Sequence, residues 1–427
     1  MSRLFAMRGP SPIVVQPEAG DDLFVPWAIT LAALVRVTTP LWLPLRDAPR
    51  VAPLPALEFS TASPIAAGVG CLGLAAGAAL LARPGMRAVA AITAAIAFAM
   101  AFDQLRWQPW AWHTVIAGVA MATLTPDAAR RWLRAVAIAV YAFSAIAKLD
   151  ASFAWTLGQQ MLGVLLGAVG IDIESLDDRT RTAAAASLPA GELLLATLLA
   201  ASLRWRRLAW PACAAAAAMH ATTVGVLGPW ALGHSAGVLL WNVGFAWQTV
   251  VLFRPTHAAE GERIPSAAHP VAWRFGVAVC LLGVAAPMGT PMGWWDQWPG
   301  WALYAPGGER ATLFVHAAAV DRLPESLRPH VAGADTDPAE GPWRRVALDD
   351  WVLAETRAPI YPQNRIVAAI GASLVERFAL TGRVLVRVES AANRWNGRRE
   401  GRTLAEASEM RSASELAGVR PAVVWPD

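Results

Sequence analysis

The sequence predicts an all-α polytopic membrane domain of about nine transmembrane helices, followed by a small α+β extracytoplasmic domain. Of the 427 residues, 56% are hydrophobic and 16% are charged, and the mean hydropathy is +0.40, which is too apolar for an ordinary soluble chain. Apolar stretches recur between residue 24 and about residue 287, and beyond about residue 298 the chain is rich in Arg, Asp and Glu. We therefore divide it into a cytoplasmic N-terminal segment (1–22), a transmembrane helical domain (23–290) and an extracytoplasmic domain (291–427).

Nine apolar segments are predicted to span the membrane. They are residues 24–45, 64–81, 87–102 and 109–124, a fifth segment ending at Lys148, a sixth beginning near Pro189 with Glu192 in its first turn, and residues 208–227, 235–253 and 273–288. Residues 153–171 are also apolar, but Gln159, Gln160 and several glycines interrupt them. We interpret this stretch as interfacial or re-entrant, because a continuous span would not carry such a break.

The distribution of arginine predicts the orientation. With residues 153–171 not crossing, one set of alternate loops carries about twice as many cations as the other, which places the N-terminus in the cytoplasm and the C-terminal domain outside. Residues 1–22 lack the apolar core of a cleavable signal peptide, so the first span is expected to act as the insertion signal.

The C-terminal domain opens with an aromatic stretch at residues 294–306, which is typical of a membrane–water interface. Residues 312–317 and 384–388 have the composition of strands, and residues 350–355 are assigned to a further strand. Residues 364–380 repeat apolar side chains on one helical face. These elements predict a small α+β domain.

Several functional classes find no support in the composition. The net charge is +4 and the pI about 9.4, but no basic stripe with interleaved aromatic residues is present, so no nucleic-acid partner is predicted. Cys71, Cys213 and Cys280 lie in apolar segments without CxxC spacing, which predicts buried thiols and neither a disulfide framework nor a metal site. No G-x-S-x-G, H-E-x-x-H or Walker pattern is present.

Lys148 is the only lysine in the chain. Arginine stays protonated, whereas a desolvated lysine can lose its proton and act as a base or nucleophile. One interpretation therefore makes Lys148 a catalytic base. The other makes it an anchor whose amine reaches the interface in a chain that otherwise uses arginine.

Polar groups in membrane spans need an explanation, because burying them in lipid is costly. Glu192 and Lys148 are predicted to end on the same side and to share an outward-opening cavity, so both are catalytic candidates together with His220. His220 lies midway along its span and is alternatively a core histidine hydrogen-bonded to a neighbouring helix. Arg36, Trp110 and His113 are weaker candidates for substrate binding. Arg36 is otherwise a structural counter-charge, and His113 an interfacial residue.

The segment Tyr141-x6-Lys148-Leu149-Asp150, followed by Phe153, resembles the lysine motif of the vitamin K-dependent gamma-carboxylases. The wider membrane family, with its bacterial relatives, is called HTTM. Asp103-x3-Trp107 and the position of His220 also resemble that family, and the resemblance covers about residues 24–253. It implies that Lys148 is the base that deprotonates a reduced quinone, and that the chain is a distant bacterial relative in the inner (cell) membrane.

The sequence departs from that family in two respects. A gapless match places Trp110 where the carboxylases carry a histidine, and the external region is reduced to about 130 residues. The leading hypothesis is an enzyme acting on a quinone-like or other lipid-soluble substrate. A non-enzymatic scaffold or assembly factor, whose C-terminal domain binds a periplasmic partner, is the alternative. A transporter is a third, although no internal repeat is found and only residues 153–171 resemble a broken helix.

Overall fold

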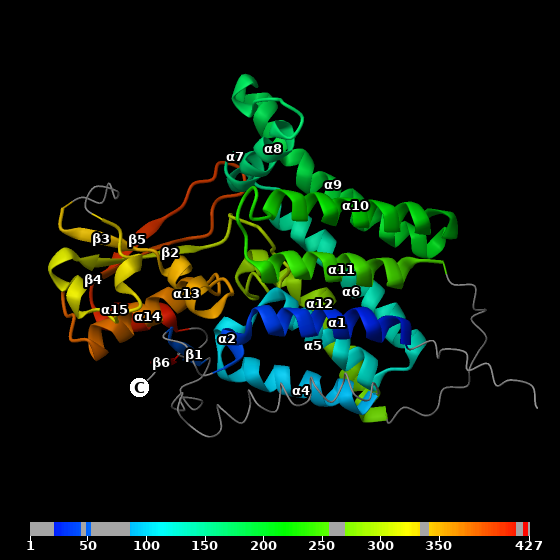
Figure 1. The fold of residues 1–427 in the computed structure, drawn as a ribbon, viewed down its shortest axis with the longest axis horizontal. Coiled ribbons are helices and arrows are strands. Elements are labelled where there is room, and N and C mark those ends of the chain that lie inside the picture. The colour runs from blue at the N-terminus through cyan, green and yellow to red at the C-terminus, as the bar shows by residue number, and fades with distance from the viewer. Residues whose placement is uncertain are drawn as a thin grey trace, which may run out of the picture.

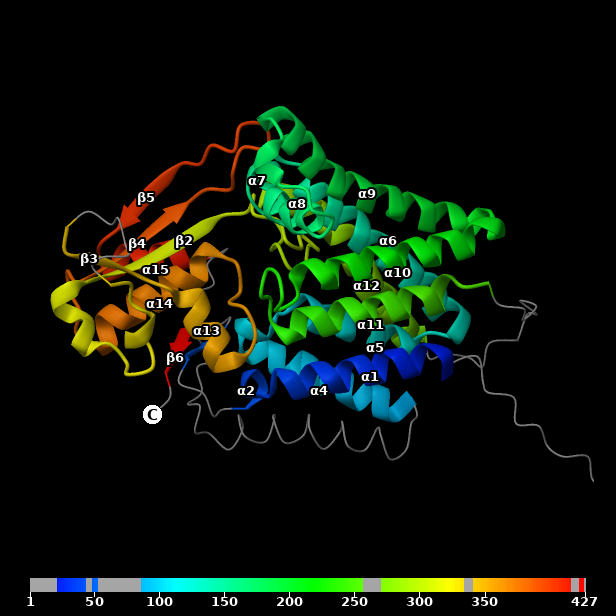
Figure 2. The same cartoon turned by 45° about the horizontal axis from the view of Figure 1, so that its top comes forward.

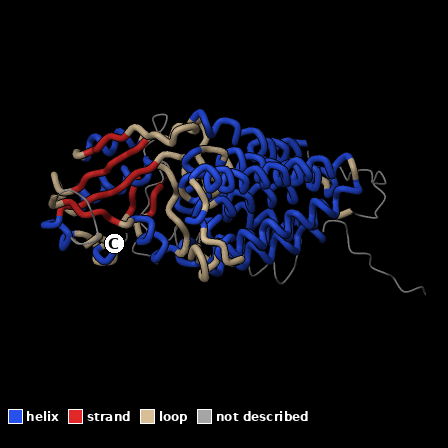
Figure 3. Tube along the Cα trace, turned by 90° about the horizontal axis from the view of Figure 1, so that it is seen from above, coloured by secondary structure: helices blue, strands red, loops and turns tan. Residues whose placement is uncertain are grey.

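The computed structural model describes residues 21–43, 48–52, 86–255, 270–333, 341–415 and 422–425. These residues form a helical bundle that is joined at one end to a smaller α+β unit (Figure 1). Seen from above, the strands gather at one end of the molecule and the long helices at the other (Figure 3). The predicted combination of a mostly helical part and a small sheet is confirmed in outline.

The bundle helices lie side by side and run alternately in opposite directions over much of their length (Figure 2). They are α1 (Asp21–Val37), α2 (Thr39–Trp42), α4 (Met86–Phe102), α5 (Pro109–Thr123), α6 (Pro126–Lys148), α7 (Ala151–Trp155), α8 (Leu157–Gly167), α9 (Asp178–Arg204), α10 (Ala209–Leu227), α11 (Ala236–Phe253) and α12 (Pro270–Ala285). Small residues allow close packing: a Cβ at Gly244 of α11 would lie 2.2 Å from the Thr30 methyl of α1. Such small-residue contacts are typical of helices that associate in a membrane.

Four helices among the described residues are long and apolar enough to cross a membrane, namely α9, α10 with its preceding turn, α11 and α12 with its following turn. The predicted nine spans are therefore not supported. Helices α1 and α4 have 17 residues and α5 has 15, while the 23-residue α6 carries several arginines at its start. The segment predicted at 64–81 and Cys71 lie outside the described residues.

Two predicted helix boundaries are wrong. The first helix ends at Val37 instead of continuing to residue 45, and the short α2 follows with a proline near its start. Helix α9 begins at Asp178 instead of near Pro189, because the carboxylate of Asp177 accepts hydrogen bonds from the first backbone N–H groups. Glu192 consequently lies well inside α9 and not in its first turn. Residues 153–171 form no continuous helix, since α7 and α8 are separated at Thr156.

The sheet is antiparallel, with strand order β3-β2-β4-β5. Its strands are β2 (Arg310–His316), β3 (Trp343–Val346), β4 (Val384–Glu389) and β5 (Gly401–Leu404), and the helices α14 (Asn364–Arg377) and α15 (Ala407–Ser414) accompany it. The pairing register aligns Val346, Leu313, Val386 and Leu404 in one row, and all four are buried. Helix α14 packs on this apolar face, and Gly371 lies against Val386. The two strands and the helix predicted from composition here are confirmed.

The strand predicted at residues 350–355 is wrong, because the segment forms helix α13 (Leu348–Thr356). Its buried residues recur at helical spacing, and two acidic residues in the first turn favour the N-terminus of a helix. The side chains that face the interior are Leu348, Trp351, Val352 and Thr356.

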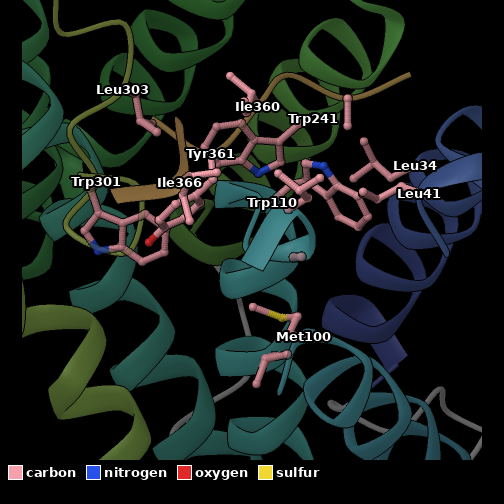
Figure 4. Close-up of a cluster of buried hydrophobic side chains, with 14 of the residues drawn as sticks. Leu34, Leu41, Met100, Trp110, Trp241, Trp301, Leu303, Ile360, Tyr361 and Ile366 are labelled. Carbon is pink, nitrogen blue, oxygen red and sulfur yellow. The ribbon is translucent and has the colours of Figure 1, made fainter. Parts of the chain in front are cut away.

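The two parts of the molecule share one hydrophobic cluster (Figure 4), in which Trp110 and Leu41 of the bundle lie near Tyr361 and Ile366 of the α+β unit. The aromatic stretch at 294–306 contributes to this junction, so its prediction as an interfacial belt is only partly right. Trp294 is 78% exposed, whereas Trp301 is fully buried.

Polar contacts also tie the bundle to the α+β unit. The indole N–H of Trp301 donates to the Gly283 carbonyl at 2.7 Å, and the Arg365 guanidinium donates to Gln104 Oε1, between α4 and α5, at 3.2 Å. The short strand β1 (Arg50–Ala52) pairs with β6 (Ala422–Val424) from the end of the chain. Strand β1 is also bonded to the bundle, because the carboxylate of Asp103, after α4, accepts a hydrogen bond from the Val51 N–H.

Candidate functional site: a cavity beside Lys148

A cavity of about 190 Å³ lies among α6, α8, α9, α10 and α11 and is closed on one side by Leu303 and Tyr304. Most of its wall is apolar, and a few polar side chains converge on it. Pockets of this composition are typical of sites for small apolar molecules, with the polar groups fixing the orientation of the ligand. The polar side chains are Tyr141, Ser144, Lys148, Glu192, His220, Thr222, Thr223, Asn242 and Tyr304.

Helical spacing brings the polar groups to the cavity. Tyr141, Ser144 and Lys148 are three and four residues apart on α6, so they share one face. Pro189 and Glu192 are three residues apart on α9 and face the same space. Lys148 is the last residue of α6, and its side chain is 9% exposed.

Lys148 and Glu192 form a buried ion pair. The Lys148 Nζ lies 2.5 Å from Glu192 Oε2, and the Glu192 side chain is 13% exposed. Nζ also donates to Ser144 Oγ at 2.9 Å and lies 5.8 Å from the centre of the Tyr304 ring. The sequence expectation that the two residues share one cavity is thus matched by the geometry.

His220 belongs to a hydrogen-bonded chain that crosses the bundle. Its Nε2 lies 2.8 Å from the Tyr141 hydroxyl, and its Nδ1 lies 3.0 Å from Asn242 Oδ1. Tyr141 also contacts Thr249 Oγ1 at 3.2 Å, and the Asn242 amide reaches the Tyr304 hydroxyl at 3.0 Å. His220 is therefore both a histidine bonded to neighbouring helices and part of the cavity wall.

Asn242 and Tyr304 are site residues that the candidate set did not contain. Asn242 is a polar residue inside an apolar span, and this is the signal that could have identified it. Tyr304 lies in the aromatic stretch that was assigned to the interface. Burial raises the pKa of Tyr304, and the nearby Glu192 carboxylate acts in the same direction, so its hydroxyl keeps its proton at neutral pH.

The three weaker candidates lie away from the cavity. Trp110 is buried against Trp42, with ring centres 5.6 Å apart. His113 is buried in the bundle beside Phe245 and is not an interfacial residue. Arg36 is exposed at the end of α1 and lines a separate hollow of about 540 Å³.

The cavity reaches the outer surface of the bundle between α8, α9 and α10. Thr222 is exposed, and Met161 and Leu188 are half-buried, and all three line the cavity. The same helices also expose large apolar side chains, since Leu194 of α9 is 69% exposed and Val169 after α8 is 71% exposed.

Within the described ranges, no group of three or more His, Cys, Asp and Glu side chains is arranged to hold a metal ion. Cys213 and Cys280 are free and buried. No protein-family model, no curated protein and no solved structure matches this chain.

Proposed function

We propose that this chain is a membrane-embedded enzyme that acts on a quinone-like or other lipid-soluble substrate, with Lys148 as general base. The observation that carries the proposal is the buried Lys148–Glu192 pair facing an apolar cavity. Ionisable pairs are costly inside a membrane protein and mark functional sites by default. The resemblance to the gamma-carboxylases also favours Lys148 as the base, and it suggests a reduced quinone as the substrate.

The pair offers a route for a proton. In the resting state Lys148 is an ammonium beside the Glu192 carboxylate. An apolar ligand that displaces water weakens the preference for charged groups, so the proton can pass from Nζ to the carboxylate. The neutral amine then takes the proton of an acidic O–H of the substrate, which leaves a substrate oxyanion, a lysine ammonium and a protonated Glu192. The ammonium stabilises the oxyanion that it has formed.

The distribution of arginine supports a membrane orientation. The start of α6, the end of α9 and the end of α11 lie at the bundle end away from the sheet (Figure 2), and arginines cluster there. They are Arg130, Arg131, Arg134, Arg204, Arg206, Arg207 and Arg254. By the positive-inside rule this end is cytoplasmic and the α+β unit is periplasmic or extracellular. We extend the membrane domain to the shorter helices α1, α4 and α5 and to α6, whose first turns carry arginines. A count of nine would also need residues 64–81.

The test uses a Lys148→Arg variant, which keeps the cation and the ion pair but cannot supply a neutral base. A short-chain naphthohydroquinone is supplied to the protein in lipid nanodiscs, and oxygen consumption is followed, because oxidation of a hydroquinone proceeds through its anion. We expect the wild-type protein to accelerate the reaction and the variant to lose about 10²- to 10⁴-fold of that acceleration. An Arg181→Lys variant, outside the cavity, serves as the control. Full activity in Lys148→Arg would show that Lys148 is not the base.

A scaffold or assembly factor is a second candidate, favoured by one observation. Trp395, in the loop after β4, is 88% exposed, directly follows Arg394 and lies three residues before Arg398. An exposed tryptophan with neighbouring arginines has the composition of a protein-binding hot spot, which would fit a periplasmic partner. In that case Lys148→Arg would be harmless and Trp395→Ala would abolish co-purification of the partner.

A further inference from the structure

The direction of each hydrogen bond at the cavity can be assigned, starting from Asn242. Its Nδ2 lies 2.9 Å from the Val238 carbonyl, and a carbonyl only accepts, so this end of the amide is the donor. The opposite atom facing His220 is therefore the amide oxygen, which accepts from Nδ1–H. A neutral imidazole has one N–H, so Nε2 accepts from the Tyr141 hydroxyl.

The orientation of the Asn242 amide also fixes the direction of its hydrogen bond with Tyr304. The Asn242 Nδ2 donates to the Tyr304 hydroxyl at 3.0 Å, so the phenol oxygen accepts in that bond. In the described part of the chain no acceptor takes the Tyr304 proton. Since the hydroxyl stays protonated and Tyr304 lines the cavity, the chain of bonds leaves one oriented O–H donor at the cavity wall.

Lys148 and Trp241 each have one further N–H group at the same cavity for which the described ranges show no acceptor. The ammonium of Lys148 has three N–H groups, and its recorded partners are Glu192 and Ser144. The indole N–H of Trp241, which is 7% exposed and lines the cavity, is buried and has no hydrogen-bond partner among the described residues. Buried donors without partners are costly, and a ligand acceptor would satisfy them.

We propose that Tyr304 is a ligand-binding residue that donates its hydroxyl proton to a carbonyl or phenolate oxygen of the molecule in this cavity. Asn242 and His220 are positioning residues that orient this hydroxyl. The inference rests on the proposed function and narrows it: the ligand is an apolar molecule carrying an oxygen acceptor, and a pure hydrocarbon is a poor ligand. It also makes the linker that follows α12 part of the site.

The experiment compares a short-chain 1,4-naphthoquinone with the matching alkylnaphthalene, which lacks both oxygens. Lys148 is the only lysine, so its acylation in nanodiscs, read by mass spectrometry of its peptide, reports occupancy of the cavity. The concentration at which each probe protects the amine gives its affinity. Loss of one neutral hydrogen bond of about 0.5–1.5 kcal/mol in Tyr304→Phe predicts about 2- to 13-fold weaker binding of the naphthoquinone. Binding of the alkylnaphthalene should be unchanged.

A second readout is the infrared spectrum of the bound probe. The carbonyl band of bound naphthoquinone should lie at lower wavenumber than that of the probe in protein-free nanodiscs, and should move back in Tyr304→Phe. Tyr361→Phe is the matched control, because the Tyr361 hydroxyl bonds to Asp296 outside the cavity. An unshifted band in the wild-type protein, or equal naphthoquinone affinity in wild-type and Tyr304→Phe proteins, refutes the role of Tyr304 and leaves the proposed function standing. If neither probe protects Lys148 in the wild-type protein, the proposed function fails and the inference fails with it.

Discussion

Replacing Lys148 with methionine should destabilise the protein far more than the loss of a surface lysine. The variant leaves the Glu192 carboxylate, 13% exposed, without the ammonium that lies 2.5 Å away. Breaking a buried ion pair by removing one partner costs about 3–5 kcal/mol of unfolding free energy. This cost exceeds that of the hydrogen bond to Ser144, about 1 kcal/mol, and that of the contact with the Tyr304 ring, about 0.5–2 kcal/mol.

The double variant separates the charge effect from packing. Glu192→Leu alone leaves the Lys148 side chain buried without its carboxylate partner. It should lower the unfolding free energy by a similar amount. When Lys148→Met and Glu192→Leu are combined, apolar side chains face an apolar cavity, and such replacements of buried pairs are often neutral. We expect the double variant to lie within about 1 kcal/mol of the wild type, which requires a coupling energy well above 3 kcal/mol.

The assay is equilibrium unfolding in mixed detergent micelles, followed by tryptophan fluorescence. Arg181→Met is the matched control, because the acidic partners of Arg181 are 72% and 90% exposed and their pairing is expected to contribute nothing measurable. Single variants as stable as the wild type would show that the pair is not buried in the folded protein. A double variant that loses the sum of both single effects would show that the two side chains do not interact.

Three further predictions concern packing, pH and the junction. Gly244→Ala should lower stability by about 1–3 kcal/mol because its Cβ would overlap Thr30, whereas Gly225→Ala, which meets nothing within 4 Å, should be neutral in thermal unfolding. Burial raises the pKa of Tyr361 above its ordinary value of about 10, so the folded state holds a proton that the unfolded state releases. Stability should therefore be intact below pH 10 and fall above it, and Tyr361→Phe should show a smaller loss between pH 9 and pH 11. Arg394→Ala removes hydrogen bonds to the carbonyls at the end of α6 and should speed acylation of the single lysine; an unchanged rate would contradict this.

The parts of the fold that were predictable are those with a local signal. The end of α6 at Lys148 follows from the change in composition there, and the valine-rich composition of β4 identifies a strand. The predicted start of α9 near Pro189 is wrong because the helix continues upstream through polar sequence to Asp178, where the Asp177 carboxylate caps it. Helix α13 was taken for a strand because a short apolar run does not distinguish the two structures.

The candidate site was predictable only where its members lie in the spans. Lys148, Glu192 and His220 are polar residues in apolar sequence, and the fold brings all three to one cavity. Tyr304 could not be found in this way, because it lies in an irregular aromatic segment and reaches the cavity only through tertiary packing. The weaker candidates Arg36 and Trp110 were predicted but lie away from the cavity. A polar or aromatic residue near a helix end does not by itself indicate which residues it will contact in the fold.

The pairing of β1 with β6 has a consequence for how the protein is made. Strand β1 leaves the ribosome early, after the first helix, and its partner follows almost the whole length of the chain later. Insertion of the helices into the membrane must therefore proceed while this edge is unpaired, and contacts between such distant segments form slowly. Until β6 is made, β1 is an unpaired edge beside the bundle, and exposed strand edges favour pairing with other chains.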